Sequence, residues 1–417
     1  MKVSLPYGPK TLSISIPDKN LREILSPREV PIPDDPAALI EQALSRPLDT
    51  GRLSELAAGA DRVALVVDDN TRATPAALLL DHMVPALESG GLDRARMTVV
   101  VALGSHRPMT EKELFGKLGA WRKRLKVIQH DHNRDLVDLG KTESGIPVSI
   151  NRQVVEAELV AGCGMVTPHN LVGYSGGAKL ILPGVASEET TGFLHTLYAT
   201  DTSTDLGQEE NSLRVACEEV ADRVGLDFLV NVVLDAQDRL VGVFAGEFRA
   251  VHRAAVRLSR EVYGLQASGR SEIVLCSCYP ADLEFYQANK GLFIAQRLVE
   301  DGGTLILASP CKEGVARTHP DFGRFIGTDP DRLMKMLESG EVDDRLSAPV
   351  AVRMGHVKKR IRIVLVTEGI GREETERMGF GWFSDVQSAL DDAIARHVTG
   401  SRVTVVTHGG KSLPLLP

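Results

Sequence analysis

Three continuous apolar runs stand out in the first half of the chain, at residues 62–67, 97–103 and 159–166. An unbroken apolar run of this length is typical of a strand that is covered on both faces, as in a parallel sheet. A segment with helical periodicity follows each run, directly or after a loop. The first half therefore alternates between buried strands and helices.

The same alternation resumes beyond residue 269. Predicted strands and helices there are 272–277, 284–300, 304–308, 330–339, 361–367, 384–397 and 402–407. The chain is also too long for one typical core. We therefore predict an α/β protein of two domains with mainly parallel sheets, at residues 1–264 and 270–417, whose last strand or tail can return to the first domain.

Two further segments precede the first apolar run. Residues 3–16 alternate apolar and polar side chains around Gly8-Pro9, which predicts a hairpin. Residues 27–36 are proline-rich and acidic, which indicates a linker into a helix at 37–45. Both segments fall in the first predicted domain.

Each apolar run of the first half ends in a polar cluster. The clusters are Asp68-Asp-Asn-Thr-Arg-Ala-Thr-Pro75, Gly104-Ser-His-Arg-Pro-Met-Thr110 and the loop Thr167–Gly184. Parallel strands place their carboxyl ends at one edge of the sheet, where ligands bind. We therefore expect Asp69, Arg72, His106, His169 and Lys179 to meet in one crevice, between the two domains.

The third loop is rich in glycine, at Gly173, Gly176 and Gly177, which lets backbone approach a ligand closely. It matches neither the phosphate-binding P-loop nor the dinucleotide fingerprint, so a nucleotide-handling enzyme is disfavoured. Taken alone, the loop is explained equally well as a turn with a surface lysine.

Composition narrows the class of protein. Hydrophobic residues make up 43% and charged residues 25%, as in a soluble globular protein, and the net charge is −8. That charge argues against nucleic acid or an anionic membrane as the main partner. No run reaches the length of a transmembrane helix, and the N-terminus lacks the apolar core of a signal peptide. The five cysteines are expected to be reduced thiols of a cytoplasmic protein.

The candidate side chains suit acid–base chemistry on an anion. His106, His169 and His195 lie near strand ends or the glycine-rich loop, and paired imidazoles beside a carboxylate clamp suit proton exchange at a neighbouring carbon or hydroxyl. Arg72 could clamp the carboxylate or pair with Asp69 within its own turn. One imidazole cannot identify a metal. These residues alone predict an α/β enzyme that acts on a small anionic substrate.

Taken together, these segments resemble the nickel-pincer lactate racemase family. The resembling segments are Asp68–Pro75, Gly104–Thr110, Pro168–Lys179, His195 and Tyr286–Lys290. They occur in the family's order and span both predicted domains, so the resemblance covers nearly the whole chain. One departure is Ala73, where the family motif usually has proline.

The resemblance implies a cofactor, the nickel-pincer nucleotide (pyridinium-3,5-bisthiocarboxylic acid mononucleotide with nickel), covalently linked to Lys179. It implies His195 as the protein ligand of the nickel. Further cofactor-binding residues would be Asp69, Tyr174, Ser175, Gly176 and Gly177. Separate cofactor-biosynthesis enzymes would be partners of the protein.

The resemblance also implies an isomerase that racemises or epimerises a 2-hydroxy acid, lactate or a related carboxylate. Hydride would pass to and from the cofactor through a 2-keto acid, with His106 and His169 as general acid/bases on opposite faces. The substrate would be held by Arg72, Tyr286, Gln287 and Lys290. The alternative is a non-catalytic carrier of the nickel cofactor, which would need neither histidine.

Overall fold

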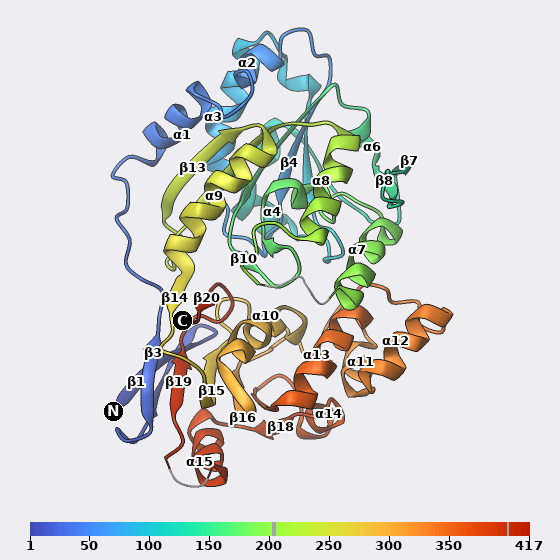
Figure 1. The fold of residues 1–417 in the computed structure, drawn as a ribbon. Helices are drawn as coiled ribbons and strands as arrows, with labels where there is room; N and C mark the ends of the chain where they lie inside the picture. The colour runs from blue at the N-terminus through green and yellow to red at the C-terminus, as the bar shows by residue number, and fades with distance from the viewer. Residues whose placement is uncertain (202–205, 398–399) are drawn as a thin grey trace.

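The computed structural model describes residues 1–201, 206–397 and 400–417, which form two α/β units stacked one above the other (Figure 1). No helix among these residues is long and apolar enough to cross a membrane. The mainly parallel sheets that the apolar runs predicted are both present.

The first unit is built on a six-stranded sheet with the order β13-β12-β9-β4-β5-β6. The strands are β4 (Val63–Asp68), β5 (Met97–Ala102), β6 (Lys126–Gln129), β9 (Leu159–Met165), β12 (Leu226–Leu234) and β13 (Leu240–Gly246). All neighbours are parallel except β12 and β13. Leu65 and Val67 belong to one apolar cluster and Ala64 and Val66 to another, so β4 is covered on both faces.

Helices and short hairpins surround this sheet. They are α1 (Pro36–Ser45), α2 (Leu53–Leu56), α3 (Ala76–Ser89), η1 (Arg94–Arg96), α4 (Glu111–Leu118), α5 (Trp121–Arg124), β7 (Leu136–Lys141), β8 (Pro147–Asn151), α6 (Arg152–Val155), β10 (Pro168–His169), β11 (Gly173–Tyr174), η2 (Gly177–Leu180), α7 (Glu188–Thr200), α8 (Ser212–Val224) and α9 (Phe248–Tyr263). Side-chain caps begin several of them. Thr110 and Glu113 form a capping box on α4, and Ser187 accepts the Thr190 N–H at α7.

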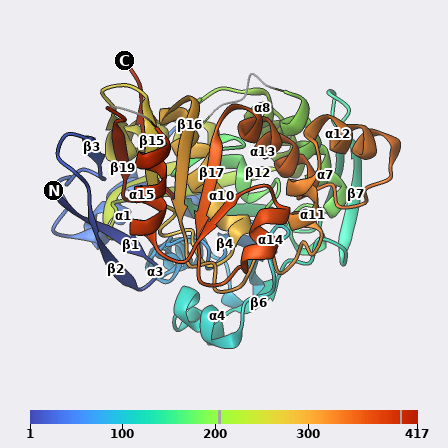
Figure 2. The same cartoon turned by 90° about the horizontal axis from the view of Figure 1, so that it is seen from below.

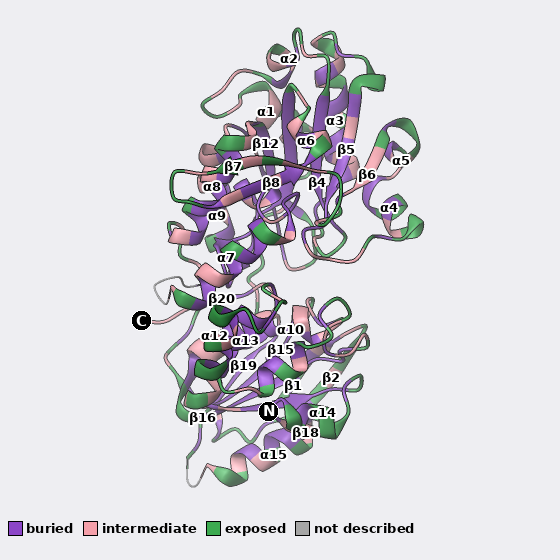
Figure 3. Cartoon of the chain, turned by 90° about the vertical axis from the view of Figure 1, so that its right-hand side faces the viewer, coloured by how far each residue is buried: buried purple, intermediate pink, exposed green. Residues whose placement is uncertain are grey.

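The second unit also contains a six-stranded sheet, all parallel, with the order β18-β17-β16-β15-β19-β3. Figure 2 shows five of these strands, β3, β19, β15, β16 and β17, side by side. The elements are β15 (Ser271–Ser277), α10 (Phe285–Ala295), η3 (Gln296–Leu298), β16 (Val299–Ala308), α11 (Phe322–Gly327), α12 (Pro330–Ser339), α13 (Ala348–Arg360), β17 (Arg362–Val366), α14 (Arg372–Arg377), β18 (Gly381–Phe383), α15 (Val386–Arg396) and β19 (Val403–Val406). In both units the central strands of the six-stranded sheet are buried and the outer helix faces are exposed (Figure 3).

The beginning of the chain belongs to the second unit, which corrects the predicted boundary of the first domain. Residues 2–15 form the expected hairpin, β1 (Lys2–Tyr7) and β2 (Lys10–Ser15), but its apolar side chains pack with those of β15 and β16. Strand β3 (Leu21–Leu25) then pairs with β19 at the edge of the second sheet. The chain crosses to the first unit only after residue 25. The reason is a pairing between segments far apart in sequence, of which the local pattern gives no sign.

Two further strands join the units at the same side. The predicted boundary between the two domains contains β14 (Gly264–Gln266), which pairs in parallel with β20 (Leu413–Leu415). Leu413 packs in one cluster with Val166 and Tyr174, so the tail contacts the first unit beside the glycine-rich loop.

Candidate active site

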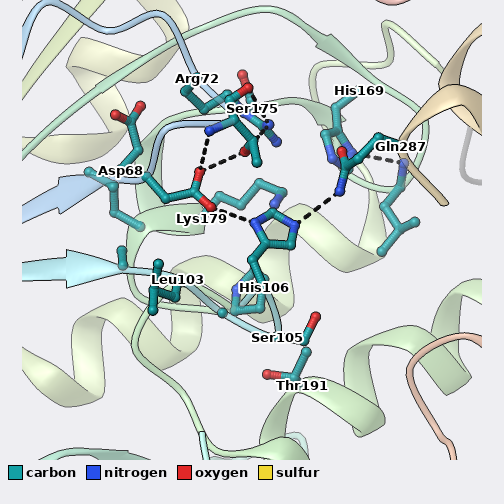
Figure 4. A pocket seen from close by; sticks show the side chains of 18 of the residues that line it. Asp68, Arg72, Leu103, Ser105, His106, His169, Ser175, Lys179, Thr191 and Gln287 are labelled. Atoms are coloured by element: carbon teal, nitrogen blue, oxygen red, sulfur yellow. Dashed lines mark hydrogen bonds and ion pairs between the residues drawn. The ribbon is translucent and has the colours of Figure 1, made fainter. Parts of the chain in front are cut away.

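The carboxyl ends of β4, β5 and β9 meet at one edge of the first sheet, because these strands are direct neighbours. Helix α10 of the second unit closes this edge into a pocket. The pocket is lined from the first unit by Asp69, Arg72, His106, His169, Lys179 and His195, and from the second by Tyr286, Gln287 and Lys290. Figure 4 shows Arg72, His106, His169, Lys179 and Gln287 around it. Folding thus gathers the side chains of three distant loops and a distant helix.

His106 is held on both ring nitrogens. Its Nδ1 lies 2.6 Å from Oδ2 of Asp69, and its Nε2 lies 3.2 Å from Nε2 of Gln287. The Gln287 amide nitrogen can only donate, so Nε2 of His106 accepts and Nδ1 donates to the carboxylate. His106 therefore presents a lone pair towards the pocket and keeps its proton on the Asp69 side.

Asp69 is ionised when it accepts this hydrogen bond from His106. Burial alone would raise the pKa of the Asp69 carboxyl, but His106, Arg72 and the Thr71 hydroxyl outweigh burial and hold it well below its usual range. The Thr71 hydroxyl donates to Asp69 at 2.6 Å. Among the described residues, the Arg72 guanidinium hydrogen-bonds only to Thr71, at 2.9 Å to its hydroxyl. Arg72 therefore keeps donors for a ligand instead of pairing directly with Asp69.

A buried ion pair beneath this loop holds Arg72 in place. Lys117 of α4 donates to Asp68 at 2.6 Å and to the backbone carbonyl of Arg72 at 2.9 Å. Both side chains of the pair are largely shielded from solvent. The bond to the Arg72 carbonyl restrains the turn at Ala73, where the family motif usually has proline. Sequence reasoning missed Lys117, because a lysine in a surface helix is usually solvated.

His169 lies on the small hairpin formed by β10 and β11. The backbone N–H of Leu171 donates to its Nδ1 at 3.1 Å, so the neutral ring carries its proton on Nε2. Desolvation, followed by the charges of Lys179, Lys290 and Arg72, lowers the pKa of His169 well below its usual value. His169 is thus neutral in the free protein, with the opposite tautomer to His106.

The glycine-rich loop fits only because its glycines have no side chain. A Cβ on Gly173 would lie 1.8 Å from the Gln208 carbonyl oxygen, and one on Gly177 would lie 2.8 Å from Cδ2 of His252. Arg214 of α8, fully buried, donates to the Tyr174 and Gly176 carbonyls from below. Sequence reasoning missed Arg214 and His252, because helix residues far along the chain show no local link to the loop.

Lys179 lies on η2 at the end of this loop and points into the pocket. Desolvation, then the charges of Arg72 and Arg214, lower the pKa of Lys179 to about 8. A substantial fraction of the amine is therefore neutral near physiological pH, which makes it a better nucleophile than an ordinary lysine.

His195 is positioned from α7 and held from the other unit. Its Nδ1 donates to the backbone carbonyl of Leu346 at 2.6 Å, which leaves the Nε2 lone pair free for the pocket. Desolvation lowers the pKa of His195 to about 4. A neutral imidazole with Nδ1–H bound to a carbonyl is the usual form of a histidine that ligates a metal.

Helix α10 supplies the second unit's side of the pocket. Lys290 donates to Oε1 of Gln287 at 2.7 Å, and the ring of Tyr286 lies 4.6 Å from that of His319, centroid to centroid. Desolvation, with Arg72 and Lys179, lowers the pKa of Lys290 well below its usual value. The basic side chains that line the pocket, Arg72, Lys179 and Lys290, outnumber its two carboxylates, and one of these, Asp68, is already paired with Lys117. The pocket therefore favours an anionic ligand.

Only some of the residues predicted to bind the cofactor line the pocket. Ser175 and Gly176 line the pocket, but the Ser175 hydroxyl is used inside the loop, donating to the Met165 carbonyl at 2.9 Å. Tyr174 points away and packs in the apolar cluster with Leu413. Gly177 donates its N–H to Asn231 and does not line the pocket. Tyr174 and Gly177 therefore shape the loop from outside the pocket lining, and their binding of a cofactor stays a prediction.

The side chains around His195 do not form a complete metal site by themselves. No group of three or more His, Cys, Asp or Glu side chains in the described part of the chain could hold a metal ion. A metal bound at His195 would therefore take its other donors from outside this set of side chains, and Lys179 lines the same pocket.

The comparisons with known proteins agree along the whole chain. Residues 7–207 match the family model of the lactate racemase N-terminal domain, and residues 267–412 match that of the lactate racemase C-terminal domain. A lactate racemase of Lactiplantibacillus plantarum is 27% identical over 98% of both chains. Another, of Thermoanaerobacterium thermosaccharolyticum, is 27% identical over 98% of this chain and 97% of the relative.

Solved structures show the same architecture. The lactate racemase apoprotein from T. thermosaccharolyticum superimposes with a TM-score of 0.89 at 26% identity, covering all of both chains. A protein from Thermotoga maritima superimposes with a TM-score of 0.68 at 21% identity, over 88% of this chain and 96% of that one, and shows similarity of fold alone.

Proposed function

The chain belongs to the lactate racemase family, and on that premise we propose that it is an isomerase that interconverts the enantiomers of a 2-hydroxy acid, lactate or a related 2-hydroxy carboxylate. The observation that carries the proposal is the meeting of His106, His169 and Arg72 in the pocket that also contains Lys179 and His195. Two proton-transfer groups, an anion clamp and a cofactor attachment point are then within one cavity.

We infer that the pocket takes a nickel-pincer nucleotide, which Lys179 would hold covalently and His195 would ligate. When bound, this group would supply a hydride acceptor and donor for the α-carbon, with the 2-keto acid as the transient substrate form. The fit comes from this chain's own groups: an amine with a lowered pKa, and a neutral imidazole whose Nε2 lone pair is free. The cofactor would bring further donors to the nickel, and the free Nε2 of His195 would add one from the protein.

The substrate carboxylate would bind to Arg72, Gln287 and Lys290. Arg72 offers donors in a planar fork that matches a carboxylate. Lys290 and Gln287 bond to each other in the free protein and come from the other unit. A bound carboxylate would therefore bridge the two units across the pocket.

His106 would take the proton of the substrate hydroxyl at Nε2. In the free protein this lone pair accepts from Gln287, so a substrate hydroxyl can replace Gln287 there and release its amide for the carboxylate. Asp69 on the opposite nitrogen stabilises the imidazolium that results, since an ionised carboxylate beside Nδ1–H favours the charged ring.

His169 would act at the hydroxyl of the other enantiomer. As an acid it needs a second proton, which the cations around it oppose in the free protein. Attachment of a cofactor removes the charge of Lys179, and a bound carboxylate offsets Arg72 and Lys290. Loading of the pocket thus removes part of the cause that keeps His169 neutral.

The test is a racemisation assay with protein produced together with the cofactor-biosynthesis enzymes. Single enantiomers of lactate and related 2-hydroxy acids are incubated, and the product is followed by chiral chromatography. The proposal predicts that at least one acid racemises. Nickel-loaded protein that racemises none of them would contradict it.

The double variant H106A/H169A separates an enzyme from a cofactor carrier. Removal of general acid–base groups usually costs about 10²–10⁴-fold in rate for each group. We expect nickel content to match the wild type while racemisation disappears. Loss of nickel together with activity would mean that one of the two histidines holds the cofactor instead.

A further inference from the structure

A turn of the second unit supports His195 from outside the pocket. His195 lies on α7 of the first unit, whereas the carbonyl that accepts its Nδ1–H belongs to Leu346, just before α13 of the second unit. The orientation of this ring, and the nitrogen that carries its proton, therefore depend on where the turn at residues 343–347 places one carbonyl.

Asp344 organises that turn. Its Oδ1 accepts the backbone N–H groups of Leu346 at 3.0 Å and Ser347 at 2.9 Å. Its Oδ2 accepts the Ser347 hydroxyl at 2.6 Å and faces Nδ1 of His319 at 3.1 Å. Four contacts to one carboxylate fix the peptide of Leu346 on both sides, so its carbonyl has little freedom to move.

The Asp344 carboxylate also contacts, through His319, the side of the pocket where the substrate would bind. His319, which it anchors, is almost fully buried and packs against the ring of Tyr286, 4.6 Å between centroids. Tyr286 lines the pocket and also packs edge-on against Phe322. Asp344 is thus connected to His195 through Leu346 and to Tyr286 through His319, although it does not line the pocket itself.

We propose that Asp344 is a positioning residue for His195: through the Leu346 carbonyl it keeps the ring proton on Nδ1 and so reserves the Nε2 lone pair for the metal. Hydrogen-bond partners behind a ligating histidine set its tautomer and orientation in this way, and their loss typically costs about 10–100-fold in metal affinity. The metal's identity rests on the proposed function, whereas the tautomer is a property of the metal-free protein.

The first test is the tautomer of His195 in metal-free protein, read from ¹⁵N–¹H NMR spectra of ¹⁵N-histidine-labelled chain. The H195Q spectrum identifies the signal. Wild type is expected to show Nδ1–H, and D344A a mixture of both tautomers. D344N keeps an oxygen for the Leu346 and Ser347 amides, so it is expected to restore the wild-type pattern.

D235A is the matched control. Asp235 also accepts two backbone N–H groups of its own turn, from Gln237 at 2.9 Å and Arg239 at 2.8 Å, but these bonds do not lead to His195. The loss of a carboxylate that caps a turn is common to both variants, and only D344A is expected to change the His195 signal.

The second test is nickel retention by cofactor-loaded protein during dialysis. D344A is expected to lose nickel at least about tenfold faster than wild type, and D235A at the wild-type rate. A wild-type His195 protonated on Nε2, or a folded D344A with the wild-type tautomer and nickel retention, would overturn the proposal. If D344A does not fold, the proposal is tested by the wild-type spectrum and by the nickel retention of S347A. A wild-type rate of nickel loss in S347A would then count against the proposal.

The two proposals fail separately. Nickel-loaded protein with the predicted His195 tautomer that racemises no 2-hydroxy acid would contradict the proposed function and leave the role of Asp344 standing. Racemisation by protein whose His195 is protonated on Nε2 would contradict the role of Asp344 and leave the proposed function standing.

Discussion

His106 and His169 differ in the nitrogen that carries the proton, and each tautomer has a local cause. The Asp69 carboxylate fixes the proton of His106 on Nδ1, whereas the Leu171 N–H occupies Nδ1 of His169. Neutral His106 is therefore ready to accept a proton from a ligand, and neutral His169 presents an N–H. In the proposed racemisation, the two rings would therefore start from different tautomers.

The charge of Lys179 contributes to the neutrality of His169, and K179M tests this. Desolvation comes first among the causes that lower the pKa of His169, and the Lys179 charge second. Removal of that charge weakens the repulsion of the imidazolium, so the pKa of His169 in the metal-free variant should rise and the ring should protonate at a higher pH. An NMR titration of the histidine ring protons measures the change.

K411M is the control for this titration. Lys411 lowers the pKa of His408, after desolvation, and is not among the causes that act on His169. K411M should therefore raise the pKa of His408 and leave that of His169 unchanged. A K179M protein whose His169 titrates as in wild type would show that the two groups are not neighbours.

The glycine-rich loop and the elements around it form one packed assembly. Its short 3-10 helix η2 carries Lys179, its hairpin carries His169, and α8 and α9 lie against it with Arg214 and His252. The conformation of the loop therefore depends on both helices, and small changes in the loop should reach the pocket.

G177A tests this packing. Gly177 has φ +62°, and a Cβ there would lie 2.8 Å from the His252 ring. Gly140 has φ +76° with nothing within 4 Å of the added atom, so G140A measures the backbone cost alone. G140A should lower the free energy of unfolding by about 1–2 kcal/mol, and G177A by about 1–3 kcal/mol more, because the clash adds to the strain.

Urea unfolding of both variants measures the difference. Equal losses in the two variants would mean that the His252 ring moves aside without cost, and would contradict the view that the loop and α9 are packed as one assembly.

The pattern of the sequence predicted the strands that position the site, because a strand covered on both faces is apolar throughout and its end is marked by polar residues. It placed Asp69, His106 and Lys179 at neighbouring strand ends for the same reason. It gave no sign of α13 or β3, since the pattern of apolar and polar residues in each differs little from that of the neighbouring segments. Lys117 bonds to Asp68 and to the Arg72 carbonyl, which lie far away along the chain, and Asp344 acts on His195 through the Leu346 carbonyl. A local pattern reveals neither link.

At the scale of the whole molecule, the chain begins in the second unit, crosses to the first and returns. The N-terminal hairpin and β3 complete the second sheet, with Val3, Leu5, Tyr7, Ile14 and Ile16 all nearly fully buried. Burial of each such side chain contributes about 1.5–3 kcal/mol. The second unit should therefore be the one that needs residues 1–25.

Deletion of residues 1–25 tests this arrangement by hydrogen exchange. The deletion removes β3, one of the two partners of β19, and uncovers the apolar face of β15, so amides in both strands should exchange faster. Those of β4, β5 and β9 should keep their protection, since their partners all lie within the first unit. Loss of protection confined to the first unit would contradict the corrected boundary.

The units meet across the pocket through His106 with Gln287 and through His195 with Leu346. In the proposed function, substrate binding and metal binding would therefore each depend on groups from both units. The relative position of the units is part of the site, which explains why a single domain's motif could not describe it.

The most direct measurement follows the hydrogen on the α-carbon. A single enantiomer of a 2-hydroxy acid that the loaded protein racemises, carrying deuterium at C2, is incubated in ordinary water and analysed by chiral chromatography with mass spectrometry. If His106 and His169 move only the hydroxyl proton, the opposite enantiomer forms and both keep their deuterium. Racemisation with deuterium replaced by solvent hydrogen would place the histidines at the carbon and contradict the account.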